Sequence, residues 1–258
     1  MSEVPDKVVT DKVVTDRVVT DKVRVGFFSF TEITDPAGHR GYNEWHMLDH
    51  MPEQFPLPGV VFGQRWVLTP ARRAAAYTTP PFDGVQYVTL YLMTDPVAAT
   101  LDAFAALGAE LYATPGRWFD ARRSRLSGPW ALGTIAAAPR VLVRAEALPA
   151  RPHRALQVVV GDAPPVEIWC ADPAIAGAWR FEPDPDLAAR RRGRIEEPIT
   201  VVWFDGDSIA ADVQLDLDRV RCSAVFEPIT PWQWDWFDFT GSEIGGSGPA
   251  AGGPPPPH

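Results

Sequence analysis

The order of strand-like and helix-like segments between residues 23 and 139 most constrains the fold of this 258-residue chain. Residues 23–30 are rich in β-branched and aromatic side chains, which are typical of strands. The segments that follow have the patterns of a helix at 42–55, strands at 61–68 and 86–93, a helix at 96–111 and a strand at 131–137. This β-α-β-β-α-β order predicts a ferredoxin-like unit, in which two helices cover one face of an antiparallel sheet.

A weaker version of the same order recurs between residues 140 and 240. Its patterns predict strands at 155–160, 178–182, 198–204 and 222–229, and helical stretches at 165–175 and 208–217. Two such sheets packed face to face would enclose one interior. The predicted fold class is therefore α+β, in which two ferredoxin-like repeats, at 23–139 and 140–240, form a pseudo-dimeric α/β barrel whose second repeat is degenerate.

The two ends of the chain differ from the middle in composition. Residues 6–25 repeat a five-residue unit, DKVVT, which matches the period of neither a strand nor a helix. Residues 1–22 are therefore predicted to form a flexible arm, with an added edge strand as the alternative. Residues 241–258 are rich in glycine and proline and predict a disordered tail.

Charge and cysteine content narrow the class of partner and the compartment. The formal net charge of −9 predicts no nucleic-acid or membrane partner, because both select clustered Lys and Arg. Cys170 and Cys222 show no CxxC spacing, which fits a reducing compartment. The chain has neither a signal-peptide pattern nor a run of about 20 apolar residues, so a cytoplasmic location is expected. The expected partner is an apolar or aromatic small molecule, and association into a homodimer stays open.

The stretch GYNEWHMLDHMPEQFPLPGVVFGQRW, residues 41–66, resembles the first helix and second strand of EthD-like proteins of the dimeric α/β barrel superfamily. The residues that carry this resemblance are Tyr42, Asn43, Trp45, Asp49, His50, Pro52, Pro58, Gly59 and Arg65. The resemblance implies a barrel with a pocket rather than one reaction, because that superfamily includes cofactor-free monooxygenases, cyclases, isomerases and haem-dependent enzymes. The second half keeps Trp169 but lacks the histidine that would follow it, so an asymmetric site is expected.

The predicted helix at 42–55 carries the candidate catalytic residues. One stripe of it displays Tyr42, His46, His50 and Glu53. The opposite stripe, Trp45, Leu48, Pro52 and Phe55, is predicted to hold the helix on the sheet. A histidine exchanges protons near neutral pH, so His50 is the candidate acid/base, with His46 and Tyr42 as further catalytic candidates. The alternative is that His50 braces the helix end and that His46 is exposed.

Five further residues are predicted to bind substrate: Asn43, Glu53, Arg65, Trp66 and Trp118. Arg65 could donate hydrogen bonds to an anionic or carbonyl oxygen, and Trp118, near Arg117 and Arg122, could close a pocket. The i, i+4 histidine pair has the spacing of two zinc ligands, but HExxH and a third ligand are missing. CxxCH, GxGxxG and GxxxxGK[ST] are also missing, so no metal and no cofactor are predicted.

These features predict a cofactor-free small-molecule enzyme of the cyclase, isomerase, lyase or monooxygenase type. It would use histidine acid/base chemistry on an apolar, aromatic or polyketide-like substrate. Two alternatives stay open. One is a non-catalytic binding or accessory protein that uses the same pocket, and the other is a haem- or metal-dependent barrel enzyme.

Overall fold

A computed structural model describes residues 23–193, 195–206, 213–232 and 234–237 of the chain. The predicted N-terminal arm, 1–22, and the predicted tail, 241–258, lie outside these residues.

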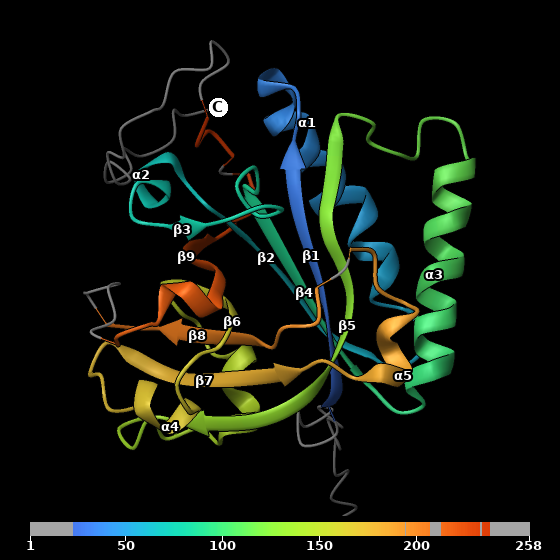
Figure 1. The fold of residues 1–258 in the computed structure, drawn as a ribbon. Coiled ribbons are helices and arrows are strands. Elements are labelled where there is room, and N and C mark those ends of the chain that lie inside the picture. Colours follow the sequence, from blue (N-terminus) through green and yellow to red (C-terminus); the bar gives the residue numbers. More distant parts are fainter. Residues whose placement is uncertain (1–22, 194, 207–212, 233, 238–258) are drawn as a thin grey trace, which may run out of the picture.

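Eight antiparallel strands close into one barrel, in the order β2-β4-β1-β5-β7-β8-β6-β9, and a β2–β9 pairing completes the ring. The barrel strands are β1 (Val23–Ile33), β2 (Val60–Val67), β4 (Tyr87–Thr94), β5 (Arg122–Ala137), β6 (Ala155–Gly161), β7 (Ile175–Glu182), β8 (Ile199–Phe204) and β9 (Val220–Pro228). A ninth strand, β3 (Tyr77–Thr78), pairs with β9 outside the ring. Figure 1 shows the long β5 bending from its place beside β1 toward its place beside β7.

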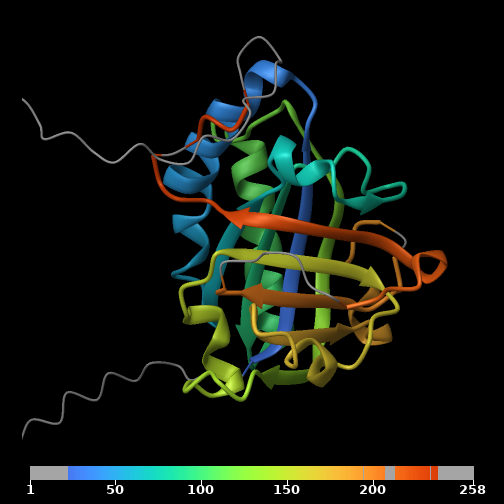
Figure 2. The same ribbon diagram turned by 90° about the vertical axis from the view of Figure 1, so that its left-hand side faces the viewer.

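Helices are few. Among the described residues only two reach seven residues in length, namely α3 (Val97–Ala113) and the helix made of α1 (His39–Glu44) with the π-helical turn η3 (Trp45–His50). In Figure 1 both lie beyond β1 and β5, and Figure 2 shows the α1–η3 helix at one edge of the barrel with α3 behind the strands. No helix in the described part of the chain has the length and apolar character needed to cross a membrane. The remaining helices are one or two turns long: η2 (Pro36–Gly38), η4 (Pro52–Gln54), α2 (Pro70–Arg73), η5 (Ala145–Ala150), α4 (Val166–Trp169), α5 (Pro185–Ala188) and η6 (Leu217–Arg219).

The predicted α+β fold of two ferredoxin-like repeats is wrong, because the chain forms one closed, mostly β barrel with few helices. The helix predicted at 165–175 shrinks to the four residues of α4, and Pro173 prevents it from continuing to residue 175. Of the helix predicted at 208–217, residues 208–212 lie outside the described part, and residues 213–216 form no helix.

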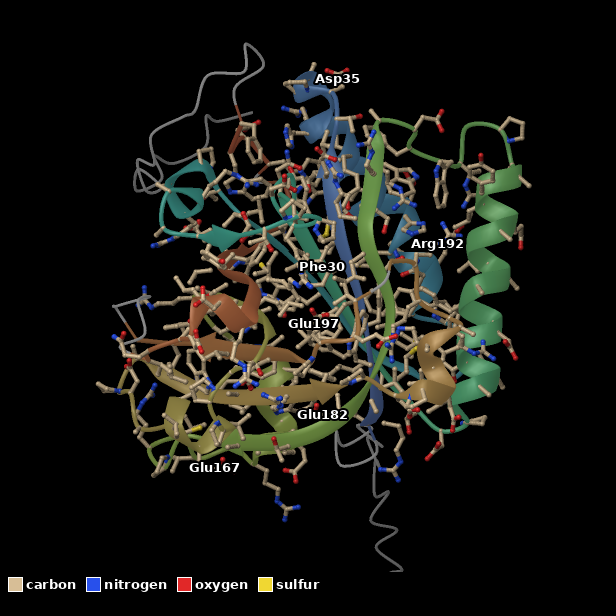
Figure 3. The ribbon with its side chains drawn as sticks, viewed as in Figure 1. Phe30, Asp35, Glu167, Glu182, Arg192 and Glu197 are labelled. Atoms are coloured by element: carbon tan, nitrogen blue, oxygen red, sulfur yellow. The ribbon has the colours of Figure 1, made fainter. Side chains whose placement is uncertain are left out.

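The interior of the barrel is filled by side chains. Alternate residues of every barrel strand point inward and join one buried apolar cluster. Phe28 meets the rings of Trp130 and Phe181 edge to face, at 6.0 and 5.1 Å between centroids. Phe30, labelled in Figure 3, lies in the same cluster. At Gly26 an added Cβ would lie 2.5 Å from the Phe181 ring, so the interior has no room even for a methyl group there.

Candidate functional site

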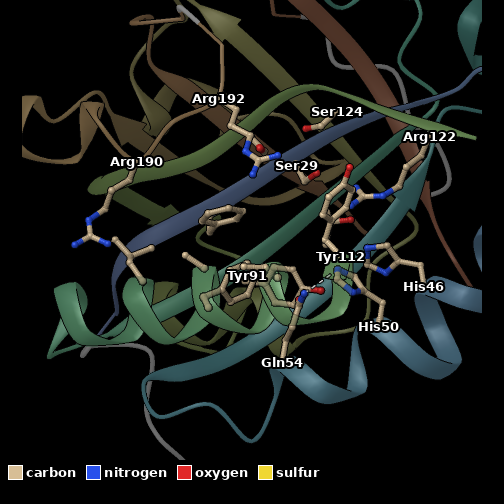
Figure 4. Close-up of a pocket in the computed structure, with 18 of the residues that line it drawn as sticks. Ser29, His46, His50, Gln54, Tyr91, Tyr112, Arg122, Ser124, Arg190 and Arg192 are labelled. Atoms are coloured by element: carbon tan, nitrogen blue, oxygen red, sulfur yellow. Dashed lines mark hydrogen bonds between the residues drawn. The ribbon is translucent and has the colours of Figure 1, made fainter. Parts of the chain in front are cut away.

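A cavity of about 790 Å³ lies between the outer face of the barrel and its two longer helices. Strands β1, β4 and β5 form its floor, and α3, η3 and the loop after α5 form its walls (Figure 4). This volume is within the range of about 300–1,000 Å³ that is usual for small-molecule sites. Because the barrel interior is packed, this outer cavity is the candidate site.

The cavity has an apolar part and a polar part. Its apolar part is formed by side chains of β1, β4 and α3, chiefly Phe27, Tyr91, Leu101, Phe104 and Ala105. Its polar part includes groups from η3 and η4 and from the start of β5, namely His46, His50, Gln54, Arg122 and Ser124. Such a cavity suits a molecule with an apolar body and a few oxygen atoms.

A π-helical turn places both histidines on the cavity. The amide of Met51 donates to the carbonyl of His46 at 2.8 Å, which is the i→i+5 bond of a π-helix. The rings of His46 and His50 then meet edge to face, with centroids 5.0 Å apart. Both side chains are buried, so the alternative that His46 is an exposed helical residue is wrong.

The orientation of this helix is opposite to the predicted one. The stripe predicted to hold the helix on the sheet is largely outward, with Leu48 43% and Phe55 45% exposed. The histidine stripe faces the barrel instead. The physical reason is that the outer face of β2 and β4 is polar at this point, where it presents Arg65 and Thr89, so it accepts polar partners.

His50 is held in place by two neighbours. Its ring stacks on Trp45 at 4.5 Å between centroids, and its Nε2 accepts a hydrogen bond from Gln54 Nε2 at 2.9 Å. Burial, followed by the positive charge of Arg122, lowers the pKa of His50 to about 3. Burial, followed by the charge of Arg65, also lowers the pKa of His46 well below 6.5. Both imidazoles are therefore neutral at neutral pH.

Several polar atoms around the cavity have no hydrogen-bond partner among the described residues. They include Nδ1 of His46, Nδ1 of His50, the Thr89 hydroxyl, the Tyr91 hydroxyl and the Ser124 hydroxyl. Buried polar groups in folded proteins are nearly always paired with protein or water. These atoms gather at one cavity, where water or a bound molecule would have to supply their partners.

Arg122 is a cation of the cavity wall close to His50. Its guanidinium lies 4.1 Å from the centroid of the Trp118 ring and 5.2 Å from that of Trp45. Its Nε is buried without a partner, and burial lowers the pKa of the group. The Trp118 ring lines the cavity, as the sequence predicts for a residue that closes a pocket.

Tyr42, Asn43 and Arg65 lie beside the cavity rather than on it. Asn43 Oδ1 accepts from Arg65 Nη2 at 3.1 Å, and Asn43 Nδ2 donates to the Tyr87 hydroxyl at 3.0 Å. The Arg65 guanidinium lies over the Tyr42 ring at 4.8 Å. The His39 Nδ1 also meets the Tyr87 hydroxyl, at 2.9 Å. This buried network fixes α1 on β2 and β4, and the catalytic role of Tyr42 and the substrate contacts of Asn43 and Arg65 stay predictions.

Two other predicted substrate residues lie away from the cavity. Trp66 points into the barrel, where its Nε1 donates to His153 Nε2 at 2.8 Å. Glu53 forms an ion pair with Arg117. Of the eight predicted site residues, the cavity therefore brings together His46, His50 and Trp118.

Sequence reasoning missed the strand residues of the site. Thr89, Tyr91 and Ser124 line the cavity beside Gln54 and Arg122. The sequence of β4, YVTLYLMT, could have indicated Thr89. Side chains of a strand alternate between its two faces, so Thr89 lies on the face opposite to the buried Val88 and Leu90. A polar residue on a strand face covered by helices points to a site rather than to core.

Comparison with known proteins supports no family. No model of a known protein family matches the chain, and no curated protein is significantly similar to it. The resemblance of residues 41–66 to EthD-like proteins is therefore overturned, because the single-chain antiparallel barrel with few helices contradicts it as well. Within the described ranges, no three His, Cys, Asp or Glu side chains gather into a group that could hold a metal ion.

Proposed function

We propose that this protein is a cofactor-free enzyme that moves a proton on a small molecule with an apolar body and a carbonyl oxygen. The observation that carries the proposal is the pair His46 and His50, two neutral imidazoles that line one cavity, each with an Nδ1 lacking a partner in the described part of the chain. Isomerisation, cyclisation and lyase reactions that pass through an enolate belong to this class.

A neutral imidazole can accept a proton from a carbon next to a carbonyl group. The low pKa of His50, caused by burial and by Arg122, makes it a weak base while the cavity is empty. An oxyanion forming beside Arg122 would offset that positive charge and raise the proton affinity of His50. The base would thus strengthen as negative charge develops, which favours the transition state over the bound substrate.

Gln54 orients the imidazole. With Nε2 of His50 accepting from the Gln54 amide at 2.9 Å, the ring proton sits on Nδ1, where it can donate a hydrogen bond but cannot leave without forming an imidazolate. Rotation of the Gln54 amide would let its Oε1, unpaired among the described residues, accept from Nε2–H instead, which frees Nδ1 as the base. Nδ1 would then take the proton from carbon, which makes the ring an imidazolium, and would return the same proton to carbon, which restores the neutral ring.

The hydroxyls of Tyr91, Thr89 and Ser124 would stabilise the enolate oxygen. Each hydroxyl is buried and has no partner in the part of the chain that the structure describes, so each has a proton to donate at no loss of a bond there. The pKa of Tyr91 is raised by burial, which keeps its hydroxyl protonated. Preorganised donors of this kind contribute about 3–4 kcal/mol each to transition-state stabilisation in other enzymes.

The proposal is tested by hydrogen exchange at carbon. The enolisable ketones 2-tetralone and 2-indanone are incubated with the protein in D₂O, and loss of the α-proton signal is followed by NMR. Exchange faster than in the protein-free buffer is expected, together with a decrease of about 100-fold or more in His50→Asn, because general bases contribute about 10²–10⁴.

Asp49→Asn is the matched control, since Asp49 is exposed on the same helical turn and does not line the cavity. It should exchange protons at the wild-type rate. If neither ketone exchanges above background while both bind, the cavity belongs to a non-catalytic binding protein. Equal rates in the wild type and His50→Asn would remove His50 from the mechanism.

A further inference from the structure

We infer that the molecule held in this cavity carries a carboxylate, which the Arg122 guanidinium binds. The inference names the substrate class of the cavity and so rests on the proposed function. It follows from the position of Arg122, the charge of the lining and the shape of the guanidinium group.

Arg122 is built into the cavity wall without a counter-ion. Two indole rings, Trp118 and Trp45, flank its guanidinium at 4.1 and 5.2 Å. No carboxylate of the described residues lies within 4.0 Å of it. Arg122 is half-buried, and a cation that is partly removed from water gains from an anionic partner.

Other arginines near the cavity do have such partners. Arg190, which also lines the cavity, pairs with Asp102 at 2.6 Å. Arg125, three residues after Arg122 on the same strand, pairs with Glu32 at 2.6 Å. Arg192, the third arginine of the lining, also has no carboxylate of the described residues within 4.0 Å, so two of the three lining arginines are left for an anionic ligand.

The lining is positively charged although the chain is acidic. Arg122, Arg190 and Arg192 line the cavity, and none of the lining residues is Asp or Glu. The chain as a whole has a net charge of −9, so the charge of the lining has the opposite sign to that of the chain. Arg192 lies between β5 and α3 in Figure 3 and faces the same space in Figure 4. Such a cavity attracts anions and rejects cations.

A carboxylate fits this position better than a spherical anion. The guanidinium is planar and offers parallel N–H groups that match the two oxygens of a carboxylate. Ser124 projects from the same face of β5 two residues later, and its unpaired hydroxyl can donate a further bond. The aromatic side chains Phe27 and Phe104 would contact the apolar body.

Binding of a carboxylate would also prepare the acid/base pair. The charge of Arg122 is one of the causes that hold the pKa of His50 low. A carboxylate on Arg122 offsets part of that charge on binding, before the oxyanion forms, so the basicity of His50 rises once on binding and again as the oxyanion develops.

The test compares acids with their uncharged amides. Binding of 2-naphthoate and 2-naphthamide, and of 4-phenylbutanoate and 4-phenylbutanamide, is measured by calorimetry on the full-length protein. Each acid is expected to bind at least about tenfold more tightly than its amide, the range of a charge-assisted hydrogen bond. Arg122→Gln should abolish this preference without weakening the amides, and Arg122→Lys should retain part of it.

Arg123→Gln is the matched control, because Arg123 is the next residue of β5, is exposed, and does not line the cavity. It should keep the full preference for acids. Acids that bind no more tightly than amides to the wild type, or a preference that survives in Arg122→Gln, would overturn the inference. Carboxylate binding without proton exchange would refute the proposed function alone, whereas exchange on ketones without a preference for acids would refute the inference alone.

Discussion

Two tyrosines on β4 allow a sharp test of the claim that the site holds unpaired polar groups. Tyr87 and Tyr91 are four residues apart on the same strand, so both project from its outer face, and both are buried. The Tyr87 hydroxyl meets His39 and Asn43 at 2.9 and 3.0 Å, whereas the Tyr91 hydroxyl has no partner among the described residues. The same substitution, Tyr→Phe, should therefore have opposite effects at the two positions.

Tyr91→Phe removes a buried hydroxyl that makes no bond. An unpaired buried polar group costs about 1–3 kcal/mol, and the ring that remains keeps its contact with Phe104 at 5.2 Å between centroids. The free energy of unfolding should rise by about 1 kcal/mol, which raises the Tm by about 2–4 °C in a protein of this size. Because the hydroxyl lines the site, proton exchange and ligand binding should weaken in the same variant.

Tyr87→Phe removes a hydroxyl that pairs with two side chains. His39 Nδ1 then has no partner left in this network of described residues, and Asn43 loses one of the two hydrogen bonds that its Nδ2 donates. The free energy of unfolding should fall by about 1–3 kcal/mol. Urea unfolding followed by tryptophan fluorescence measures both variants, with 10 tryptophans as reporters. Equal destabilisation by the two substitutions would refute the reasoning, since it would mean that Tyr91 is also paired.

Three further outcomes are expected. The folded-state pKa of His50, about 3, lies below its ordinary 6.5, so the unfolded chain binds the proton more tightly. Between pH 7 and 5 the wild type should lose about 2 kcal/mol more stability than His50→Gln, and equal losses in urea titrations would mean that His50 is charged when folded. Gly59→Ala should lower the free energy of unfolding by about 1–3 kcal/mol in the same assay, because φ is +82° and the new Cβ would lie 2.1 Å from Thr100 Oγ1. Asn43→Ala should cost about 2–3 kcal/mol, measured likewise, since it leaves the buried Arg65 without its hydrogen-bond acceptor, while acids keep their preference over amides.

The strands of this fold could be predicted from the sequence, but the closure of the barrel could not. β-Branched and aromatic runs predict the strands at 23–30, 61–68, 86–93 and 198–204, each of which the structure confirms within a few residues. The pairing of β2 with β9 joins residues more than 150 positions apart through two residue pairs, and no local pattern encodes so distant a contact. In the second half, the helix predicted at 165–175 is wrong beyond the four residues of α4, and residues 213–216 form no helix.

For the site, the sequence predicts which histidines take part better than it predicts where the neighbouring side chains point. His46 and His50 were identified from their i, i+4 spacing, and the structure brings both to the cavity. The π-helical turn shifts the side chains that follow it, so Glu53 faces Arg117 and Gln54 takes the place beside His50. A helical wheel assumes 3.6 residues per turn and cannot anticipate this shift.

The distribution of polar groups between the two faces of the barrel wall argues that function lies on the outer face. Inside, the strands supply Phe, Leu, Val and Trp that fill the space, which is what stability alone would select. Outside, where the helices cover the same strands, stability alone would again select apolar side chains, yet Thr89 and Tyr91 hold unpaired hydroxyls there. Each such group makes the fold less stable than an apolar residue would. Since Arg122 adds a shielded charge at the same place, a bound anion is the simplest partner that satisfies all three residues together.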